Sequence, residues 1–177
     1  NLPGTLREVD KIKQVIKRSD IFRDVNVTER NVKEFSRNGT LSRYKVVHFA
    51  THGLIVPEVP ELSAVVLSQF KDNTGKEDGY LRMGEIAELD IRADFVNLSA
   101  CETGLGKIYG GEGVVGLTQS FILAGANAVS VSLWSVADKS TSLFMVATYN
   151  MVHNYNLSYA DAMTEVKRQF IKGEFGE

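Results

Sequence analysis

Val46-Val47-His48-Phe49-Ala50-Thr51-His52-Gly53 and Phe95-Val96-Asn97-Leu98-Ser99-Ala100-Cys101-Glu102-Thr103-Gly104 are the two stretches that decide the fold of this chain. Each is an apolar, β-rich run that ends in a reactive side chain followed by a turn. The first ends on the imidazole of His52, and the second ends on Cys101, the only cysteine in the sequence. Two neighbouring parallel strands with these endings would bring a thiol beside a base, which is the arrangement that a cysteine nucleophile needs.

The pattern around these stretches predicts an α/β fold with strands alternating with helices. Apolar runs predict strands over 24–27, 44–50, 64–67, 95–100 and 128–134, and helical spacing predicts helices over 5–18, 28–41, 82–88, 114–123, 138–150 and 158–172. Such an alternation is typical of a mostly parallel sheet with helices on both faces. His52 and Cys101 would then follow the carboxyl ends of their strands, where ligands bind in these folds. The pattern leaves open whether the two strands are neighbours.

Composition narrows the class of protein. The length of 177 residues fits one domain, over 1–177, and the net charge of -2, with 20 Lys+Arg and 22 Asp+Glu, argues against a nucleic-acid binder. We expect no membrane span, no signal peptide, no cofactor and no metal. A single cysteine can form no internal disulfide, so we expect a reducing, cytoplasmic setting. The abrupt ends suggest a fragment of a larger protein, truncated at both ends.

The chemistry expected at the pair is acyl transfer to a thiolate. A nearby imidazole raises the thiolate fraction of a cysteine, and the backbone N–H groups of Gly53 and Cys101 are candidate donors to an oxyanion. The residue that would orient His52 stays open. A lone buried cysteine is more often a core residue than a nucleophile. His48, which lies within its strand, fits a hydrogen-bonded structural histidine better than a catalytic one.

Several blocks along the chain resemble the CHAT domain family of caspase-like cysteine peptidases, which are often fused to TPR repeats. The similarity is carried by Leu2-Pro3-Gly4-Thr5, His48-Phe49-Ala50-Thr51-His52-Gly53, Ser99-Ala100-Cys101-Glu102-Thr103-Gly104, Gly111-Glu112-Gly113-Val114, Ala124-Gly125-Ala126 and Leu133-Trp134-Ser135-Val136-Ala137-Asp138. The resemblance implies a caspase-like three-layer sandwich and a His/Cys dyad at His52 and Cys101. It also implies a protein or peptide substrate and an associated TPR-type repeat region.

Two functions follow as hypotheses. The first is a cysteine endopeptidase regulated by a helical-repeat region in bacterial signalling, defence or cell death. The second is a caspase-like scaffold or adaptor domain without turnover. For the peptidase, Asp138 is a candidate substrate-binding carboxylate, because it follows the strand expected to end at Trp134. It would favour a basic residue before the cleaved bond, although the same residue could simply cap the following helix.

Overall fold

The computed structural model describes residues 3–56, 58–69, 77–102, 112–132 and 138–175. The chain divides into two compact units. One unit comprises Phe22–Ser135 and holds the β-sheet, and the other comprises Asn1–Ile21 together with Val136–Glu177 and is helical. The residues that the sequence predicts as nucleophile and base both belong to the sheet unit.

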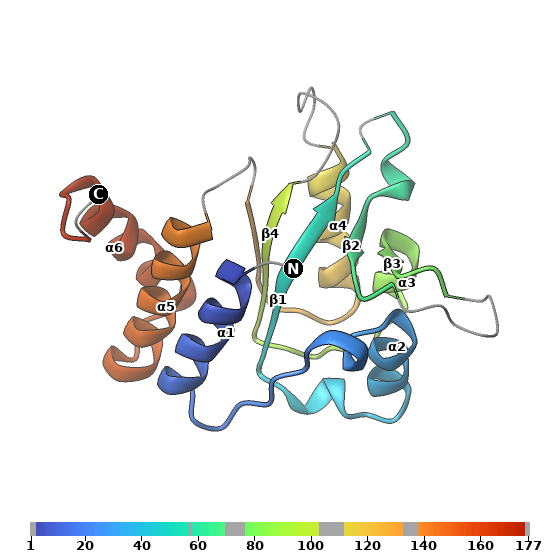
Figure 1. Cartoon of the computed structure of the whole chain (residues 1–177), viewed down its shortest axis with the longest axis horizontal. Coiled ribbons are helices and arrows are strands. Elements are labelled where there is room, and N and C mark those ends of the chain that lie inside the picture. The colour runs from blue at the N-terminus through green and yellow to red at the C-terminus, as the bar shows by residue number, and fades with distance from the viewer. Residues whose placement is uncertain (1–2, 57, 70–76, 103–111, 133–137, 176–177) are drawn as a thin grey trace. The chain divides into compact units, whose positions relative to one another are not determined.

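The sheet unit is built around five strands in the order β3-β2-β1-β4-β5 (Figure 1). They are β1 (Val46–Leu54), β2 (Ala64–Val66), β3 (Tyr80–Arg82), β4 (Phe95–Glu102) and β5 (Val129–Val131). β4 runs parallel to both β1 and β5, whereas β2 is antiparallel to both β1 and β3. The predicted α/β class with a parallel core is confirmed, and an antiparallel hairpin extends one edge of the sheet.

One face of this sheet packs against α2 (Glu29–Arg37), α3 (Met83–Ala87) and α4 (Glu112–Leu123). The shared core contains side chains from all of these elements: Val32, Phe49, Val65, Leu81, Ile86, Val96, Leu98, Val114, Leu117 and Phe121. The rings of Phe49 and Phe121 lie 5.6 Å apart, which ties β1 to α4. Burial of these apolar side chains is the main force that holds the helices on the sheet.

Local interactions define the start of α2 and the end of α4. Thr28 caps α2, because its hydroxyl accepts a hydrogen bond from the backbone N–H of Asn31 at 3.2 Å. Gly125 follows α4 with φ of +101°, and a Cβ there would meet the backbone N of Arg92 at 3.0 Å. Only glycine adopts this conformation beside another backbone without strain.

Other boundaries differ from the prediction. The segment predicted as a strand over 24–27 is a short 3-10 helix, η1 (Asp24–Asn26). Strand β3 was missed: the sequence predicts a helix over 82–88, whose first residue, Arg82, is the last residue of β3. Strand β5 is shorter than predicted, and Trp134 lies outside the described residues. The remaining short helices are η2 (Leu41–Arg43) and η3 (Pro60–Leu62).

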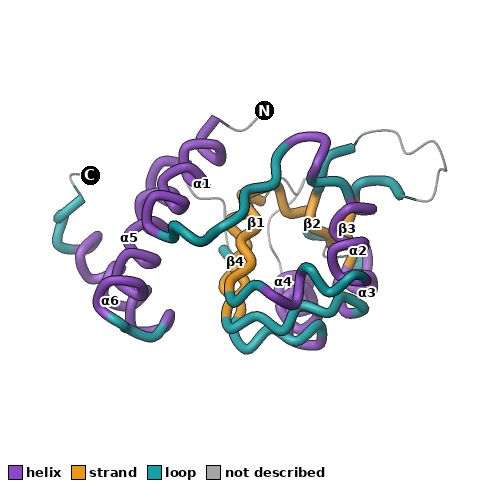
Figure 2. Tube along the Cα trace, turned by 90° about the horizontal axis from the view of Figure 1, so that it is seen from below, coloured by secondary structure: helices purple, strands orange, loops and turns teal. Residues whose placement is uncertain are grey.

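The helical unit consists of α1 (Pro3–Val15), α5 (Asp138–Tyr155) and α6 (Tyr159–Ile171). Within it, α5 packs against both α1 and α6 (Figure 2). Its buried side chains include Ile12, Met145, Tyr149, Ala162 and Val166. Aromatic contacts join α5 to α6, with Phe144 and Phe170 at 6.0 Å and Tyr149 and Tyr159 edge-on at 6.4 Å. None of the helices in the described ranges is long and apolar enough to cross a lipid bilayer.

Candidate functional site

The candidate site lies on the ladder between β1 and β4, the longest in the sheet. The two strands run parallel side by side (Figure 1), and the register pairs Val46 with Phe95 and continues to Gly53 with Glu102. In this register His52 is the direct partner of Cys101. The sequence left open whether the two strands are neighbours, and the structure makes them adjacent.

Both residues lie inside their strands rather than after them. The sequence predicts strand ends at Ala50 and Ala100, whereas β1 continues to Leu54 and β4 continues to Glu102. The longer strands have a physical cause, because β1 gains a second neighbour here: His52 pairs with Val66 of the antiparallel β2. His52 and Cys101 therefore lie near the end of the β1–β4 ladder, where β1 is paired with a strand on each side.

A second pair of residues on the same ladder shows how the side chains of two register partners interact. His48 pairs with Asn97 four residues upstream, and Asn97 Nδ2 lies 3.2 Å from His48 Nδ1. Asn97 is only 2% exposed. Because side chains alternate along a strand, His48 and His52 share the face opposite to Phe49. His48 is thus the hydrogen-bonded structural histidine that the sequence predicts.

The surroundings of His52 differ from those of His48. The Nδ1 atom of His52 is buried and has no hydrogen-bond partner among the residues that the structure describes. Gly53 is also buried, within β1. For Cys101 the structure describes the backbone position only. The catalytic roles of His52 and Cys101, and the oxyanion-hole roles of the N–H groups of Gly53 and Cys101, stay predictions.

Asp138 occupies the first turn of α5. It belongs to the helical unit, whereas His52 and Cys101 belong to the sheet unit. The strand that the sequence extends to Trp134 ends at Val131 in the described residues. A substrate-binding role for Asp138 therefore stays a prediction.

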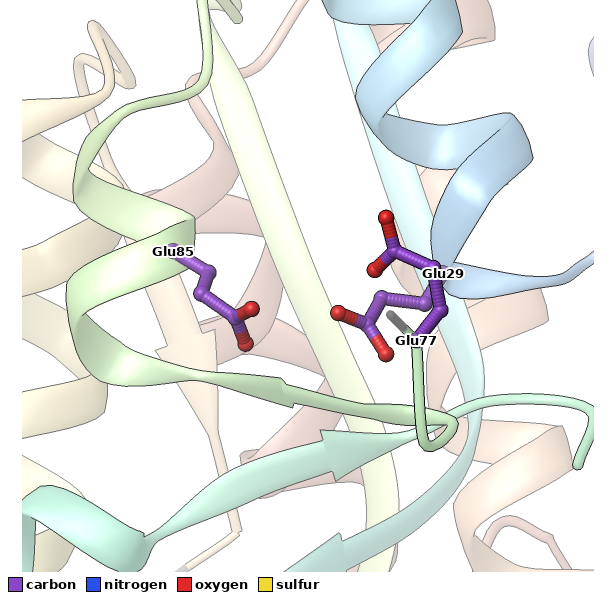
Figure 3. A group of neighbouring side chains, drawn as sticks. All are labelled: Glu29, Glu77 and Glu85. Carbon is purple, nitrogen blue, oxygen red and sulfur yellow. The ribbon is translucent and has the colours of Figure 1, made fainter. Parts of the chain in front are cut away.

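A charged cluster that sequence reasoning did not single out lies elsewhere in the sheet unit. The carboxylates of Glu29, Glu77 and Glu85 converge from α2, the segment before β3 and α3 (Figure 3), close enough together to hold a metal ion. However, Lys33 Nζ contacts all three, at 2.6 Å from Glu29, 2.8 Å from Glu77 and 2.7 Å from Glu85. The ammonium group thus occupies the centre of the cluster and offsets one of its three negative charges, and a metal cation would have to displace it.

This cluster also fixes the β2–β3 connection. The buried Glu29 accepts hydrogen bonds from the backbone N–H groups of Asp78 and Gly79, both at 3.0 Å. Burial alone would lower the pKa of Lys33, but hydrogen bonds from its ammonium group to the glutamates outweigh burial and raise that pKa. The sequence signal was the Glu29–Lys33 spacing of four residues on one helix. Glu77 and Glu85 carry no local signal, since they join the cluster through the fold.

The fold defines an α/β domain with a caspase-like sheet, in which a histidine and a cysteine are register partners near the ends of adjacent parallel strands. The model of the CHAT domain family matches residues 1–175. The chain therefore belongs to the CHAT domain family, which is caspase-like and generally associated with peptidase function. No curated protein matches this chain with significance.

Proposed function

We propose that this chain is a cysteine endopeptidase in which Cys101 is the nucleophile and His52 is the general base. The observation that carries the proposal is their pairing at one register position of the β1–β4 ladder. Neighbouring strands lie about 4.8 Å apart, and paired positions share one face of the sheet. A thiol and an imidazole at such a rung are within reach of proton transfer, either directly or through one water molecule.

The reaction follows from these two groups. The thiol proton of Cys101 passes to the imidazole of His52, and the thiolate attacks the carbonyl carbon of the scissile peptide bond. The C–N bond then breaks, and the departing amine takes the proton from the imidazolium. Water, deprotonated by the same imidazole, hydrolyses the thioester and restores the thiol. We assign the backbone N–H groups of Gly53 and Cys101 to the oxyanion of the tetrahedral intermediate.

The proposal includes a preference for Lys or Arg before the cleaved bond, with Asp138 as the acidic partner. Family membership supports a peptide substrate, and we propose regulation by a TPR-type repeat region in bacterial signalling, defence or cell death. Profiling a peptide library with the active enzyme tests the preference. Cleavage after Asp or Glu, or an unchanged profile in Asp138→Ala, would leave Asp138 as a helix cap.

The catalytic proposal is tested with a peptidyl acyloxymethyl ketone, which alkylates a thiolate that is activated in a substrate-binding site. We expect one covalent adduct per chain in an intact mass spectrum, mapped by digestion to Cys101, and its loss in His52→Ala. A matched control is His153→Ala, since His153 is exposed on α5. Equal labelling of His52→Ala and His153→Ala would show that His52 does not activate the thiol, and would favour the scaffold function.

A further inference from the structure

A groove lies between α3 and α4 on the sheet unit, away from the β1–β4 rung that carries His52. Its volume is about 620 Å³, and it is bordered by η3 as well as by the two helices. The residues that line it are Glu61, Arg82, Met83, Gly84, Glu85, Ala87, Glu88, Gly116, Gln119, Ser120 and Leu123. None of these residues has a role in the proposed peptidase chemistry.

The floor and one wall of the groove are apolar. A Cβ on Gly116 would collide with the methyl group of Met83, so the glycine lets Met83 of α3 lie directly against α4. On the rim, Leu123 is 75% exposed and Leu62, beside Glu61 on η3, is 47% exposed. Val115 and Ile122 are also exposed on α4, outside the lining of the groove. Exposed apolar side chains beside an apolar groove are a feature of interaction surfaces.

Gly84 is a glycine in the lining of the groove that the packing of the domain does not require. It lies within α3, where glycine costs about 1 kcal/mol relative to alanine. Yet a Cβ built on Gly84 meets no atom within 4 Å, and its backbone has no positive φ. The packing of the domain therefore does not require glycine at this position, and a bare backbone there leaves the groove open.

The charges at the groove select the sign of the occupant. Arg82 is held by Asp78 at 2.6 Å, and Glu85 is held by Lys33 at 2.7 Å. Glu61 and Glu88 are exposed, and neither makes an ion pair within the part of the chain that the structure describes. Two uncompensated negative charges thus border an apolar floor.

We propose that this groove binds a basic amphipathic helix from a partner protein. Its apolar face would pack on Met83, Ala87 and Leu123, while Lys or Arg side chains beside that face would pair with Glu61 and Glu88. A helix that lays its apolar stripe into a groove between two helices is a recurrent mode of recognition. The acidic border adds specificity and a faster association with basic partners than with neutral or acidic ones.

The test uses the full chain and a fluorescein-labelled, 14-residue peptide of Leu and Lys, with Leu at helical spacing. Fluorescence anisotropy should give saturable binding in roughly the micromolar range, and a peptide with Glu in place of Lys should not bind. Gly84→Gln, which fills the groove with a polar side chain, should weaken binding at least tenfold, and Gly84→Ala, which adds only a methyl group, should weaken it less. Leu123→Ser should also weaken it, at a position too exposed to affect folding.

The charge contribution is tested separately. Replacing Glu61 and Glu88 together by Gln should weaken binding about tenfold, while replacing Glu34 and Glu165, two exposed carboxylates outside the groove, should change it less than twofold. The proposal fails if the acidic peptide binds equally well or if both double variants lose binding equally. It also fails if Gly84→Gln abolishes self-association in sedimentation velocity, because the occupant would then be a second copy of this chain. None of these readouts depends on peptidase activity.

Discussion

Two rungs of one ladder carry the histidines of β1, and they differ in what faces each imidazole. At the first rung His48 meets the amide of Asn97 at 3.2 Å, and Asn97 is 2% exposed. At the second rung, four residues later, His52 pairs with Cys101. Both rungs share a register, a strand pair and a face of the sheet, so the difference between them lies in the partner and in the position along the strands.

The comparison separates a histidine with a hydrogen-bonded structural role from a histidine that is a candidate for catalysis. The imidazole of His48 satisfies a buried amide that would otherwise cost free energy. The Nδ1 atom of His52 is buried with no hydrogen bond in the described part of the chain, and its register partner is the only thiol of the protein. A buried polar atom without a hydrogen bond requires a physical explanation, and a catalytic role is one such explanation.

Removing either side chain of the His52–Cys101 pair should have the largest effect, and we expect that effect on peptide cleavage rather than on stability. We expect His52→Ala and Cys101→Ala each to lower kcat/KM for peptide cleavage by about a thousandfold or more, because either substitution removes the proton transfer that creates the thiolate. Thermal unfolding should change little. The measurement is cleavage of a fluorogenic peptide, with Tm recorded for each variant. A large loss of Tm in both variants would instead assign His52 and Cys101 to the structural core.

Removing the hydrogen bond between Asn97 and His48 should instead lower stability and leave peptide cleavage nearly unchanged. Asn97→Val leaves His48 facing an apolar side chain, and we expect the free energy of unfolding to fall by about 1–3 kcal/mol. Activity per folded molecule should stay within threefold of the parent. Urea unfolding measures the first quantity and active-site titration the second. Asn127→Val is the matched control, since Asn127 is exposed and its hydrogen bond to Asp94 is long, at 3.4 Å. Equal losses in both variants would show that the His48 rung contributes no more than a surface amide.

Transplanting the thiol sharpens the comparison further. In a Cys101→Ala background, Asn97→Cys recreates a histidine–cysteine pair at the first rung. We expect no peptide cleavage, and alkylation by iodoacetamide at least tenfold slower than that of Cys101 in the parent, because position 97 is buried. Intact mass spectra taken over time give both rates. Equal alkylation rates would mean that position along the strands does not distinguish the rungs.

The sequence predicted the two central strands well and the edge of the sheet poorly. β1 and β4 are continuous apolar runs, which few other structures accommodate. By contrast, β3 has three residues and exists through its pairing with β2, so nothing local distinguishes Tyr80–Arg82 from a helix start. At η1, Val25 and the following Val27 have the alternate spacing of a strand, although residues 24–26 form a 3-10 turn.

The candidate site divides in the same way. Residue types and strand ends identified His52 and Cys101, but their register depends on the whole ladder, since one residue of slip would move a side chain to the other face. The cluster around Lys33 shows the same limit. Its helical pair with Glu29 is visible in the sequence, whereas Glu77 and Glu85 lie 44 and 52 residues away from Lys33. Contacts of that separation are set by tertiary structure.

The smallest expected effect concerns the acid sensitivity of the fold at the ion pair between Asp78 and Arg82. The guanidinium of Arg82 holds the pKa of Asp78 below its usual value near 3.9. A lowered pKa stabilises the folded state at pH values above the unfolded pKa, and the contribution is lost as pH falls through the lowered pKa. Asp78 is about half exposed, so solvent screening limits the effect to about 0.5 kcal/mol. We therefore expect the free energy of unfolding of Asp78→Asn, measured with urea, to be lower than that of the parent by this amount at pH 7. At the most acidic pH where both proteins fold, the two free energies should be equal. The substitution keeps the side-chain oxygen that accepts from the N–H of Tyr80 at 3.0 Å, so the difference reports the loss of the charge together with the hydrogen bond from Arg82 Nη2 to Oδ2. Because the pKa of Asp78 is lowered, its titration is complete well below pH 6, and Asp78→Asn and the parent should show the same pH dependence of peptide cleavage between pH 6 and 9. A profile that shifts with Asp78→Asn in that range would instead trace the pH dependence to the fold.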